Sequence, residues 1–423
     1  MVGSVAEKAV TPWVAGTLPC GLRWVHQETT APTGHIGLIV RAGTRDEGPD
    51  EPGLAHFIEH LLFKGTVRRK PFHLLSKIED AGGELNAYTG KEDTTVYASF
   101  LAENYPAALD VLLDIAFRSV FPEKELKKEQ EVIADEIDAY LDAPSELIFD
   151  DFEELLFAGH ALGHNILGTK ESLQTFTREQ VLRFVRTHYV PANMVLSSVG
   201  RISAARLERL LLRLTADVPE SLHAPVPHRS PAPSYAPVQK TGRDTHQCHV
   251  VLGSRAVSVH DAALTTGVLL NNVLGGPAMS SRLNLNIRER YGIAYQIESF
   301  FTPYSDTGLQ GVYVGTDSDA VDRAVRLIHK ELRQLREVPL GVVQLAKAKQ
   351  QLLGQMALAQ ESPGAWMTAL GRSYLLFNRM ETFDELRAKV NAVTAQDVRE
   401  LANRWYDPAQ LTTLVYEPTD EDD

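Results

Sequence analysis

The feature that most constrains this chain is residues 53–63, a short stretch with two histidines and a glutamate at helical spacing. His56 and His60 are four residues apart, so on an α-helix their imidazoles lie on one face, about one turn apart. Glu59 directly precedes the second histidine, so its carboxylate lies beside both rings. The apolar residues recur on the opposite side, which predicts that this side is buried and fixes the direction of the histidines. These apolar residues are Leu54, Phe57, Ile58, Leu61 and Leu62.

Residues 122–141 form a second predicted helix, which begins at a proline and is rich in acidic residues. Glu129 and Glu136 are two turns apart and flank its apolar stripe. Acids on a merely solvated helix more often point away from the apolar side, although the spacing alone also fits a charged surface helix. The stripe consists of Leu126, Ile133, Ile137, Tyr140 and Leu141.

Two imidazoles and one carboxylate are a common catalytic zinc set that leaves a fourth position for water. Such an ion lowers the pKa of the water and polarises a carbonyl. An unligated Glu59 can take the proton of the water and return it to a leaving amine, so the predicted chemistry is metal-assisted amide hydrolysis. From the residues alone, Glu129 and Glu136 are equally good third ligands. The alternative is an ordinary helix whose two histidines are solvated or hydrogen-bonded within the protein.

The length of 423 residues is too great for one core and predicts at least two domains. A hydrophobic content of 44% with 23% charged residues is typical of a soluble globular protein. The net charge of −13 argues against a nucleic-acid partner and against an anionic membrane surface. No apolar run reaches the roughly eighteen residues of a membrane span.

The compartment is predicted from the N-terminus and the cysteines. Residues 1–8 lack a basic region followed by an apolar core, so no secretory signal is expected. Cys20 and Cys248 are far apart and are the two cysteines of the chain, which favours a reducing cytoplasm and excludes a cysteine-based structural zinc site.

The chain is predicted to contain two copies of one α+β unit. Residues 177–181 and 189–193 resemble residues 394–398 and 406–410, and both pairs are separated by 217 positions, which indicates a tandem duplication. The proline-rich residues 217–245 are the predicted linker between a first domain, 1–216, and a second, 246–423. In the second copy the helix that includes residues 269–274 lacks histidine, so one half is expected to be catalytic and the other a scaffold or wall.

The predicted strands surround the histidine helix. Residues 22–44 are rich in β-formers, and residues 84–89 and 94–100 are expected to form a β-hairpin around a turn at 90–93. A further helix is expected over residues 71–81, and the second half begins again with a β-rich run at 248–252.

Other candidate sites are weaker. His160 and His164 repeat the four-residue spacing, but Gly159 and Gly163 predict a loop there. Residues 275–281 lack the Gly-Lys-Ser/Thr ending of a phosphate loop and are expected to be a turn after a helix. No Gly-x-Ser-x-Gly motif occurs.

Four separated motifs in one order resemble the pitrilysin/insulinase family of zinc metallopeptidases, in which the His-x-x-Glu-His signature is called inverzincin. Within that family the chain is similar to bacterial two-domain members related to the catalytic subunit of the mitochondrial processing peptidase. The motifs are residues 56–66, 83–89, 129–137 and 281–295.

The resemblance implies a role for each residue of the site. His56 and His60 are the implied zinc ligands, Glu136 the third ligand, and Glu59 the general base. Glu129 is the implied acid that supports the ligands from behind. One Zn²⁺ per chain is expected.

The resemblance also implies how substrate is held. Asn86, Ala87 and Tyr88 are expected on an edge strand that pairs with the substrate backbone, a mode that accepts many sequences in extended form. Arg288 and Tyr295 are expected to reach across from the second half and to steady the substrate carbonyl or tetrahedral intermediate.

The implied fold is α+β, with two homologous α/β-sandwich domains whose sheets are mixed, mainly antiparallel and covered by helices. They are expected to form half of a clamshell chamber, which a homodimer closes around peptides or unfolded segments. The expected function is that of a zinc endopeptidase in the cytoplasm. The alternatives are a non-catalytic assembly subunit of a heteromeric peptidase and an enzyme that needs a different partner chain. A transit peptide and a glycine-rich loop are not evident, so presequence processing is not implied.

Overall fold

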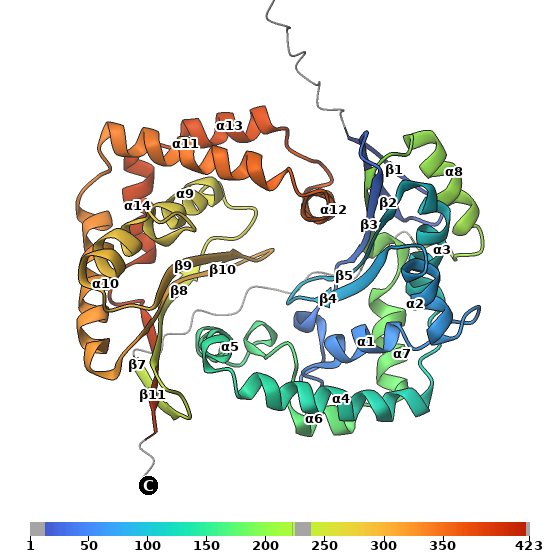
Figure 1. Cartoon of the computed structure of the whole chain (residues 1–423), viewed down its shortest axis with the longest axis horizontal. Helices are drawn as coiled ribbons and strands as arrows, with labels where there is room; N and C mark the ends of the chain where they lie inside the picture. Colours follow the sequence, from blue (N-terminus) through green and yellow to red (C-terminus); the bar gives the residue numbers. More distant parts are fainter. Residues whose placement is uncertain (1–12, 222, 225–237, 420–423) are drawn as a thin grey trace, which may run out of the picture.

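The computed structural model describes residues 13–221, 223–224 and 238–419, which form two halves with one β-sheet each (Figure 1). The first sheet contains, in spatial order, β1 (Val14–Thr17), β2 (Arg23–Glu28), β6 (Met194–Gly200), β3 (Thr33–Val40), β5 (Thr94–Leu101) and β4 (Glu84–Thr89). The second contains β7 (Val238–Arg243), β11 (Thr412–Pro418), β8 (Cys248–Ala256), β10 (Gly308–Thr316) and β9 (Gln296–Pro303). Residues 1–8, on which the prediction about a secretory signal rests, lie outside the described residues.

The two sheets share their strand order and the directions in which neighbouring strands pair. β2 pairs with β6 in parallel and β7 pairs with β11 in parallel, whereas the remaining neighbours are antiparallel. Apart from β1, the strand order of the first sheet is repeated element by element in the second. The predicted α+β fold with two mixed, mainly antiparallel sheets is confirmed, and the repeated order is what a duplicated unit gives.

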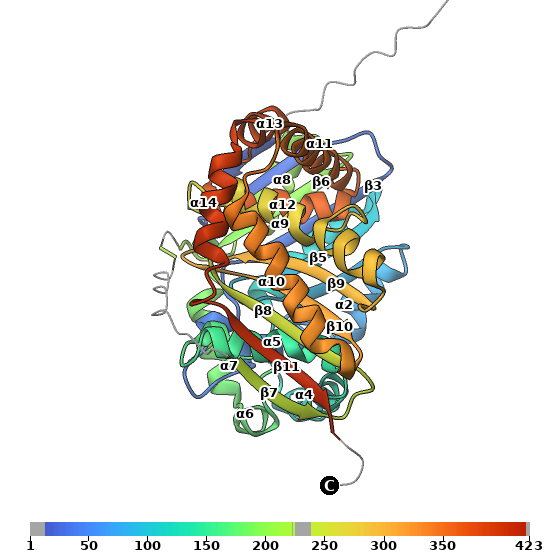
Figure 2. The same cartoon turned by 90° about the vertical axis from the view of Figure 1, so that its left-hand side faces the viewer.

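Helices cover both sheets, and Figure 2 shows α10 and α14 across the outer face of the second one. The first half contains α1 (Leu54–Leu62), α2 (Pro71–Glu79), α3 (Tyr105–Arg118), α4 (Glu123–Leu141), α5 (Pro144–Leu156), α6 (Lys170–Thr175), α7 (Arg178–His188) and α8 (Ala204–Leu214). The second contains α9 (Leu264–Gly275), α10 (Val321–Glu337), α11 (Val342–Ala359), α12 (Pro363–Phe377), α13 (Phe383–Ala392) and α14 (Ala395–Trp405). The predicted helices at 53–63, 71–81 and 122–141 and the predicted hairpin are confirmed.

Equivalent helices begin with equivalent local signals. Thr177 caps α7 and Thr394 caps α14, and each accepts a hydrogen bond from the backbone N–H three residues later. The residues at those third positions, Gln180 and Asp397, bond back to the threonine backbone N–H. These reciprocal bonds satisfy donors that a helix start otherwise leaves open, which is why the repeated motif of the sequence marks two helix starts.

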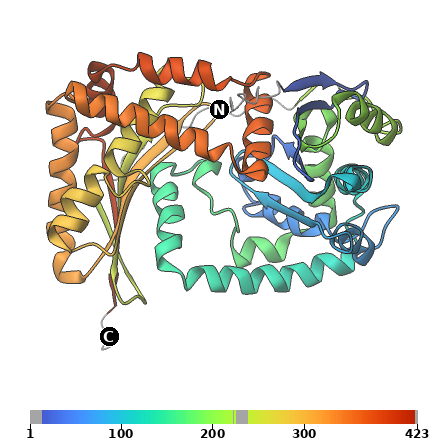
Figure 3. The same ribbon diagram turned by 45° about the horizontal axis from the view of Figure 1, so that its top comes forward.

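Each half lends one helix to the other (Figure 3, where α5 is the teal helix beside the yellow strands and α12 the orange helix beside the blue strands). α12 packs on β3 and β6 of the first sheet, where Ile39 and Met367 share one buried cluster. α5 packs on β8 and β11 of the second sheet, where Phe152 and Tyr416 share another. Successive strand residues therefore face different apolar layers, which explains why β3 is continuously apolar over residues 36–40 instead of alternating.

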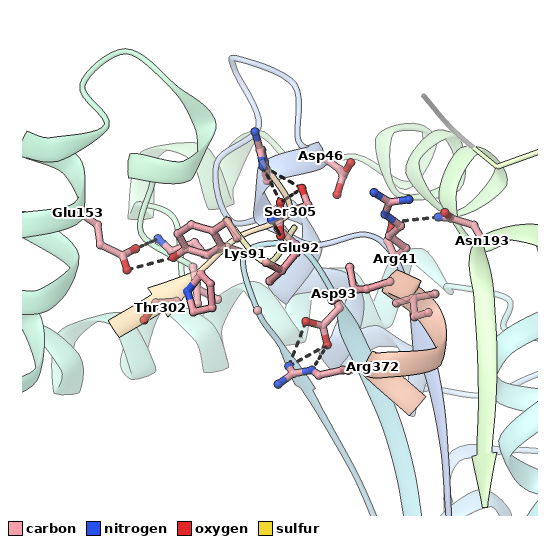
Figure 4. Close-up of a pocket in the computed structure, with 18 of the residues that line it drawn as sticks. Arg41, Asp46, Lys91, Glu92, Asp93, Glu153, Asn193, Thr302, Ser305 and Arg372 are labelled. Carbon is pink, nitrogen blue, oxygen red and sulfur yellow. Dashed lines mark hydrogen bonds and ion pairs between the residues drawn. The ribbon is translucent and has the colours of Figure 1, made fainter. Parts of the chain in front are cut away.

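Charged turns meet where the halves join (Figure 4). The β4–β5 turn and the β9–β10 turn line a pocket of about 400 Å³. Arg45 of the first half is 2.8 Å from Asp306 of the second, and Arg372 of α12 is 2.8 Å from Asp93. Ser305 donates its backbone N–H to Glu92 at 2.8 Å. The bond of Ser305 to Glu92 joins the two turns, and the two ion pairs connect each turn to the opposite half.

Two details differ from the predictions. Leu141, assigned to the apolar stripe of α4, is 47% exposed because it lies at the helix end, beyond the packed turns. Residues 238–243, assigned to the linker, form β7, an edge strand with mostly exposed residues that lacks a clear apolar alternation. Residues 222 and 225–237 of that linker lie outside the described residues, so the domain boundary stays a prediction.

A search of the described helices for a possible bilayer crossing finds none that is long and apolar enough.

Alanine is expected to have opposite effects at two helical glycines, one on α12 where it packs on the first sheet and one on the exposed part of α11. A Cβ at Gly371 would collide with Ile39 and lie 2.8 Å from Ser197 Cβ, so Gly371→Ala should destabilise the protein by about 1–3 kcal/mol through overpacking. Gly354 of α11 has nothing within 4 Å of such an atom, so Gly354→Ala should stabilise by about 0.5–1 kcal/mol. Thermal unfolding midpoints measure both, and equal shifts would contradict the close helix–sheet contact.

Candidate metal centre

Helix α1 is held in place by its start and by its apolar face. Gly53 has a φ of 93°, and a Cβ there would lie 2.6 Å from the Leu167 carbonyl oxygen, so the entry to the helix requires glycine. The five predicted apolar residues of the helix are all fully buried in the first-half core. Burial of this face leaves His56 and His60 on the opposite side, as the spacing predicts.

Glu47 caps α1 from six residues upstream. Its carboxylate accepts hydrogen bonds from the backbone N–H groups of Gly53 at 3.0 Å and Ala55 at 2.8 Å. Burial raises the pKa of Glu47, and the two N–H groups act against that shift. A carboxylate at this place complements the positive end of the helix dipole. The helix that carries the histidines is therefore anchored at its N-terminus.

Helix α4 packs against α1 and brings the two acids to the histidines. Glu136 Oε1 is 3.8 Å from His56 Nε2, and Glu136 Oε2 is 3.4 Å from His60 Nε2. Glu129 Oε2 is 3.1 Å from the other ring nitrogen of His60, Nδ1. The two acids therefore face different sides of one imidazole, which separates candidates that the residues alone left equal.

The geometry fits a single metal ion. One donor atom from each of His56, His60 and Glu136 lies within 4.8 Å of the others. Donor atoms about 2 Å from one tetrahedral zinc ion lie roughly 3.3 Å apart, close to the contacts of Glu136 with both rings. Burial and the neighbouring His60 lower the pKa of His56 to about 4, so its imidazole is neutral at pH 7 and keeps a lone pair for a metal.

Glu59 lies beside this set without belonging to it. Its Oε2 is buried and has no hydrogen-bond partner among the described residues. Burial raises the pKa of Glu59, and polar groups of Thr89 together with His60 act against that shift. A carboxylate with one buried oxygen that lacks a hydrogen-bond partner, next to a possible metal position, is suited to hold and release a proton.

Strand β4 forms the edge of the first sheet next to α1. Asn86, Ala87 and Tyr88 all lie on it, as the resemblance implies, and Asn86 is exposed. The Ala87 N–H donates to Asn86 Oδ1 at 2.8 Å, so it is directed to the free edge of the sheet. An added strand would find that donor available once the Asn86 side chain moves aside.

Arg288 and Tyr295 are not brought to the histidines. Arg288 lies in the short π-helical segment Asn284–Glu289, and Tyr295 directly precedes the edge strand β9. Both are exposed, and the Tyr295 hydroxyl lies 3.1 Å and 3.2 Å from the two carboxylate oxygens of Asp317. In the described part of the chain neither contacts His56, His60 or Glu59.

His160 and His164, the second histidine pair, make contacts that stabilise local structure. His160 accepts the N–H of Leu162 at 3.1 Å and so caps the short 3₁₀ turn Ala161–Gly163. The backbone oxygen of His164 receives the ammonium of Lys91. Of the segment 275–281, predicted to be a turn after a helix, Gly275 ends α9 and residues 276–281 form the turn that follows.

Sequence patterns did not reveal two contributors to the site. Glu47 precedes the first residue of its helix, Leu54, by seven positions, outside any capping signature. Lys64 contacts Glu129 at 2.6 Å from beyond the end of α1, a pairing between two helices that spacing within one helix cannot show. The cluster of acids in a turn-rich segment before the histidines was the signal available for Glu47.

Comparison with known families identifies the class as a peptidase. The family described as insulinase (peptidase family M16) matches residues 23–170, and the one described as peptidase M16 inactive domain matches residues 175–352. The chain belongs to the insulinase family, peptidase family M16. The two family models match different halves of the chain, which agrees with the distribution of histidines. Helix α1 of the first half contains His56 and His60, whereas the equivalent helix of the second half, α9, contains none.

Curated relatives cover most of the chain. An uncharacterized zinc protease of Bacillus subtilis, YmxG, is 33% identical over 90% of this chain and 92% of its own length. A probable mitochondrial-processing peptidase subunit beta of Arabidopsis thaliana is 32% identical over 92% of this chain and 75% of its own length. The corresponding beta subunit of Bos taurus is 29% identical over 98% and 85%.

Solved structures share the fold. A peptidase M16 inactive domain from Pseudomonas fluorescens superposes with a TM-score of 0.89 at 19% identity, over 97% of this chain and 98% of that one. A protease from Helicobacter pylori gives a TM-score of 0.88 at 20% identity, over 96% and 100%. At these identities the likeness concerns the fold alone.

Proposed function

We propose that the chain is a zinc-dependent endopeptidase that hydrolyses peptides or unfolded segments, with one Zn²⁺ bound by His56, His60 and Glu136. The observation that carries this proposal is the convergence of three donor atoms within 4.8 Å beside Glu59, whose buried Oε2 has no hydrogen-bond partner among the described residues. Relatives named zinc proteases support the choice of metal.

Each residue near the centre has one task in this proposal. Zinc held there would polarise a substrate carbonyl and acidify a water molecule. Glu59 takes the proton of that water and delivers it to the leaving amine, and its raised pKa suits a group that must hold a proton between the two steps. Glu129 accepts a hydrogen bond from His60 Nδ1, which leaves Nε2 free as a donor to the metal.

The substrate is held as an added strand along β4. Asn86, Ala87 and Tyr88 supply backbone groups at the free edge next to α1, so the scissile bond would lie close to Glu59. Because backbone groups provide this recognition, the proposed substrates share an extended shape more than a sequence.

Arg288 and Tyr295 would act on the same substrate from the second half. Their exposure leaves both side chains able to contact a bound peptide, where a guanidinium and a phenol can stabilise a developing oxyanion. The two halves are proposed to form one side of a chamber that a second copy closes, which would exclude folded proteins. The two cysteines, both free and buried, support a cytoplasmic enzyme, for which fractionation of the source cells is the test.

A second candidate is a subunit of a heteromeric peptidase, because two relatives are named as beta subunits of mitochondrial-processing peptidase. As a non-catalytic subunit the chain would bind no zinc and cleave nothing. As a catalytic subunit it would bind zinc and remain inactive until a different partner chain is added.

The Glu59→Gln variant tests the catalytic proposal. Glutamine keeps the shape of the side chain but cannot accept a proton, so zinc content should be retained while cleavage of a quenched peptide falls by about 10²- to 10⁴-fold. Glu131→Gln, an exposed acid on α4, is the matched control and should change neither quantity. Full activity of Glu59→Gln would remove Glu59 as the base, and a wild-type chain that lacks both zinc and cleavage would favour the assembly subunit.

Proline at position 87 tests the substrate strand. Ala87→Pro removes one edge N–H, and since a hydrogen bond contributes about 0.5–1.5 kcal/mol, kcat/KM should fall by roughly twofold to tenfold. Ala87→Val changes the side chain but keeps the N–H, so it should stay near the wild-type value. Equal kcat/KM values for the two variants would exclude backbone pairing at this residue.

The proposed pairing of chains predicts a particle of twice the single-chain mass. Light scattering coupled to size-exclusion chromatography measures this directly on the purified protein. A single-chain mass at all accessible concentrations would contradict the homodimer and favour assembly with a different partner.

A further inference from the structure

Lys64 is the outermost member of a row of contacts that ends at the candidate metal ligands. Its ammonium Nζ is 2.6 Å from Glu129 Oε1, and Glu129 Oε2 is 3.1 Å from His60 Nδ1. On the far side of the same ring, Nε2 is 3.4 Å from Glu136 Oε2. Lys64 is four residues after His60, just past the end of α1, so it extends the row by one helical turn.

Burial makes this row different from a surface ion pair. Glu129 is 4% exposed, and among the described residues its carboxylate pairs with Lys64 and His60. A carboxylate removed from water needs a partner for each oxygen, because an unpaired buried charge is strongly unfavourable. Lys64 occupies one oxygen, so the other is left to face His60.

We propose that Lys64 is a positioning residue for the metal centre. It holds Glu129 in the orientation that binds His60 Nδ1, and this bond turns His60 Nε2 toward Glu136. The inference rests on the proposed zinc site and adds a residue that acts two contacts away from the ion. Without the ammonium group, Glu129 loses its fixed orientation and the imidazole loses its support from behind.

The chain offers a matched control on the neighbouring helix. Lys128 pairs with Glu125 at 2.8 Å on α4, but its side chain is 54% exposed, and among the described residues no ion pair joins it to the metal centre. Loss of this exposed pair should have little effect on zinc, since surface pairs are screened by water. Comparing the two variants separates the effect of losing any lysine near α4 from the effect of losing Lys64 itself.

Zinc affinity of the metal-free protein, measured by competition with a chelator, is the primary readout. Lys64→Met should weaken zinc binding by about 10- to 100-fold, the usual effect of removing support behind a ligand. Lys64→Arg should lie between wild type and Lys64→Met, because it keeps a donor cation at this place. Lys128→Met should equal wild type.

A double-mutant cycle tests whether the effect passes through Glu129. In a Glu129→Gln background, Lys64→Met should weaken zinc binding no further, because the carboxylate that it orients is gone. Equal losses in both backgrounds would overturn the proposal. Near-ultraviolet circular dichroism checks the fold of each variant, and Lys64→Gln replaces Lys64→Met if the latter does not fold.

The outcomes distinguish this inference from the proposed function. If wild type binds zinc and cleaves peptides while Lys64→Met binds zinc as tightly as wild type, the role of Lys64 is wrong and the function stands. If Lys64→Met weakens zinc binding but wild type alone cleaves no peptide, the role of Lys64 stands, and catalysis by this chain without a different partner is wrong. A wild-type chain that binds no zinc overturns both.

Discussion

The structure of the candidate centre depends on burial of one face of α1. Five apolar side chains on that face are at most 1% exposed, and at about 1.5–3 kcal/mol each their burial contributes on the order of 10 kcal/mol before entropic costs. Charging the buried His56 would cost about 3 kcal/mol, judged from its lowered pKa of about 4. The apolar term is larger, so the helix stays in place and the histidine stays neutral. A weakly packed helix would instead rotate to expose its histidines to water.

The duplicated fold kept one buried ion pair and lost the metal residues. Asp114 of α3 pairs with Arg69 at 2.6 Å, and 217 positions later Glu331 of α10 pairs with Arg282 at 3.7 Å. The positions equivalent to Glu129 and Glu136 at the same offset are an alanine and a leucine, Ala346 and Leu353. The second half therefore has an acid paired with an arginine at the same helix position, while its α11 carries apolar residues where α4 carries acids.

The sequence was most informative where a pattern lies within one element. Helical spacing placed His56, Glu59 and His60, and two β-forming runs around a turn placed the hairpin of β4 and β5. Periodicity shows that a helix has an apolar face but not which sheet covers it, so the exchange of α5 and α12 could not be foreseen. The same limit applies to Glu47 and Lys64, because the partners of each lie outside its own element. Only the positions in space show that Glu47 bonds to the start of α1 and that Lys64 contacts Glu129, the acid behind His60.

The exchanged helices also determine how the halves can move. Ion pairs at their junction contribute little where they are exposed, as for Arg372 with 43% of its side chain accessible. The apolar contacts are far more extensive, since α12 buries Met367 and Leu370 on the first sheet while α5 buries Ile148 and Phe152 on the second. Rotation of one half against the other would have to break both clusters. The two clusters, more than the ion pairs, therefore determine how the halves are placed. Because these clusters hold the halves in place, Arg288 and Tyr295 stay in the second half, without a contact to His56, His60 or Glu59 among the described residues.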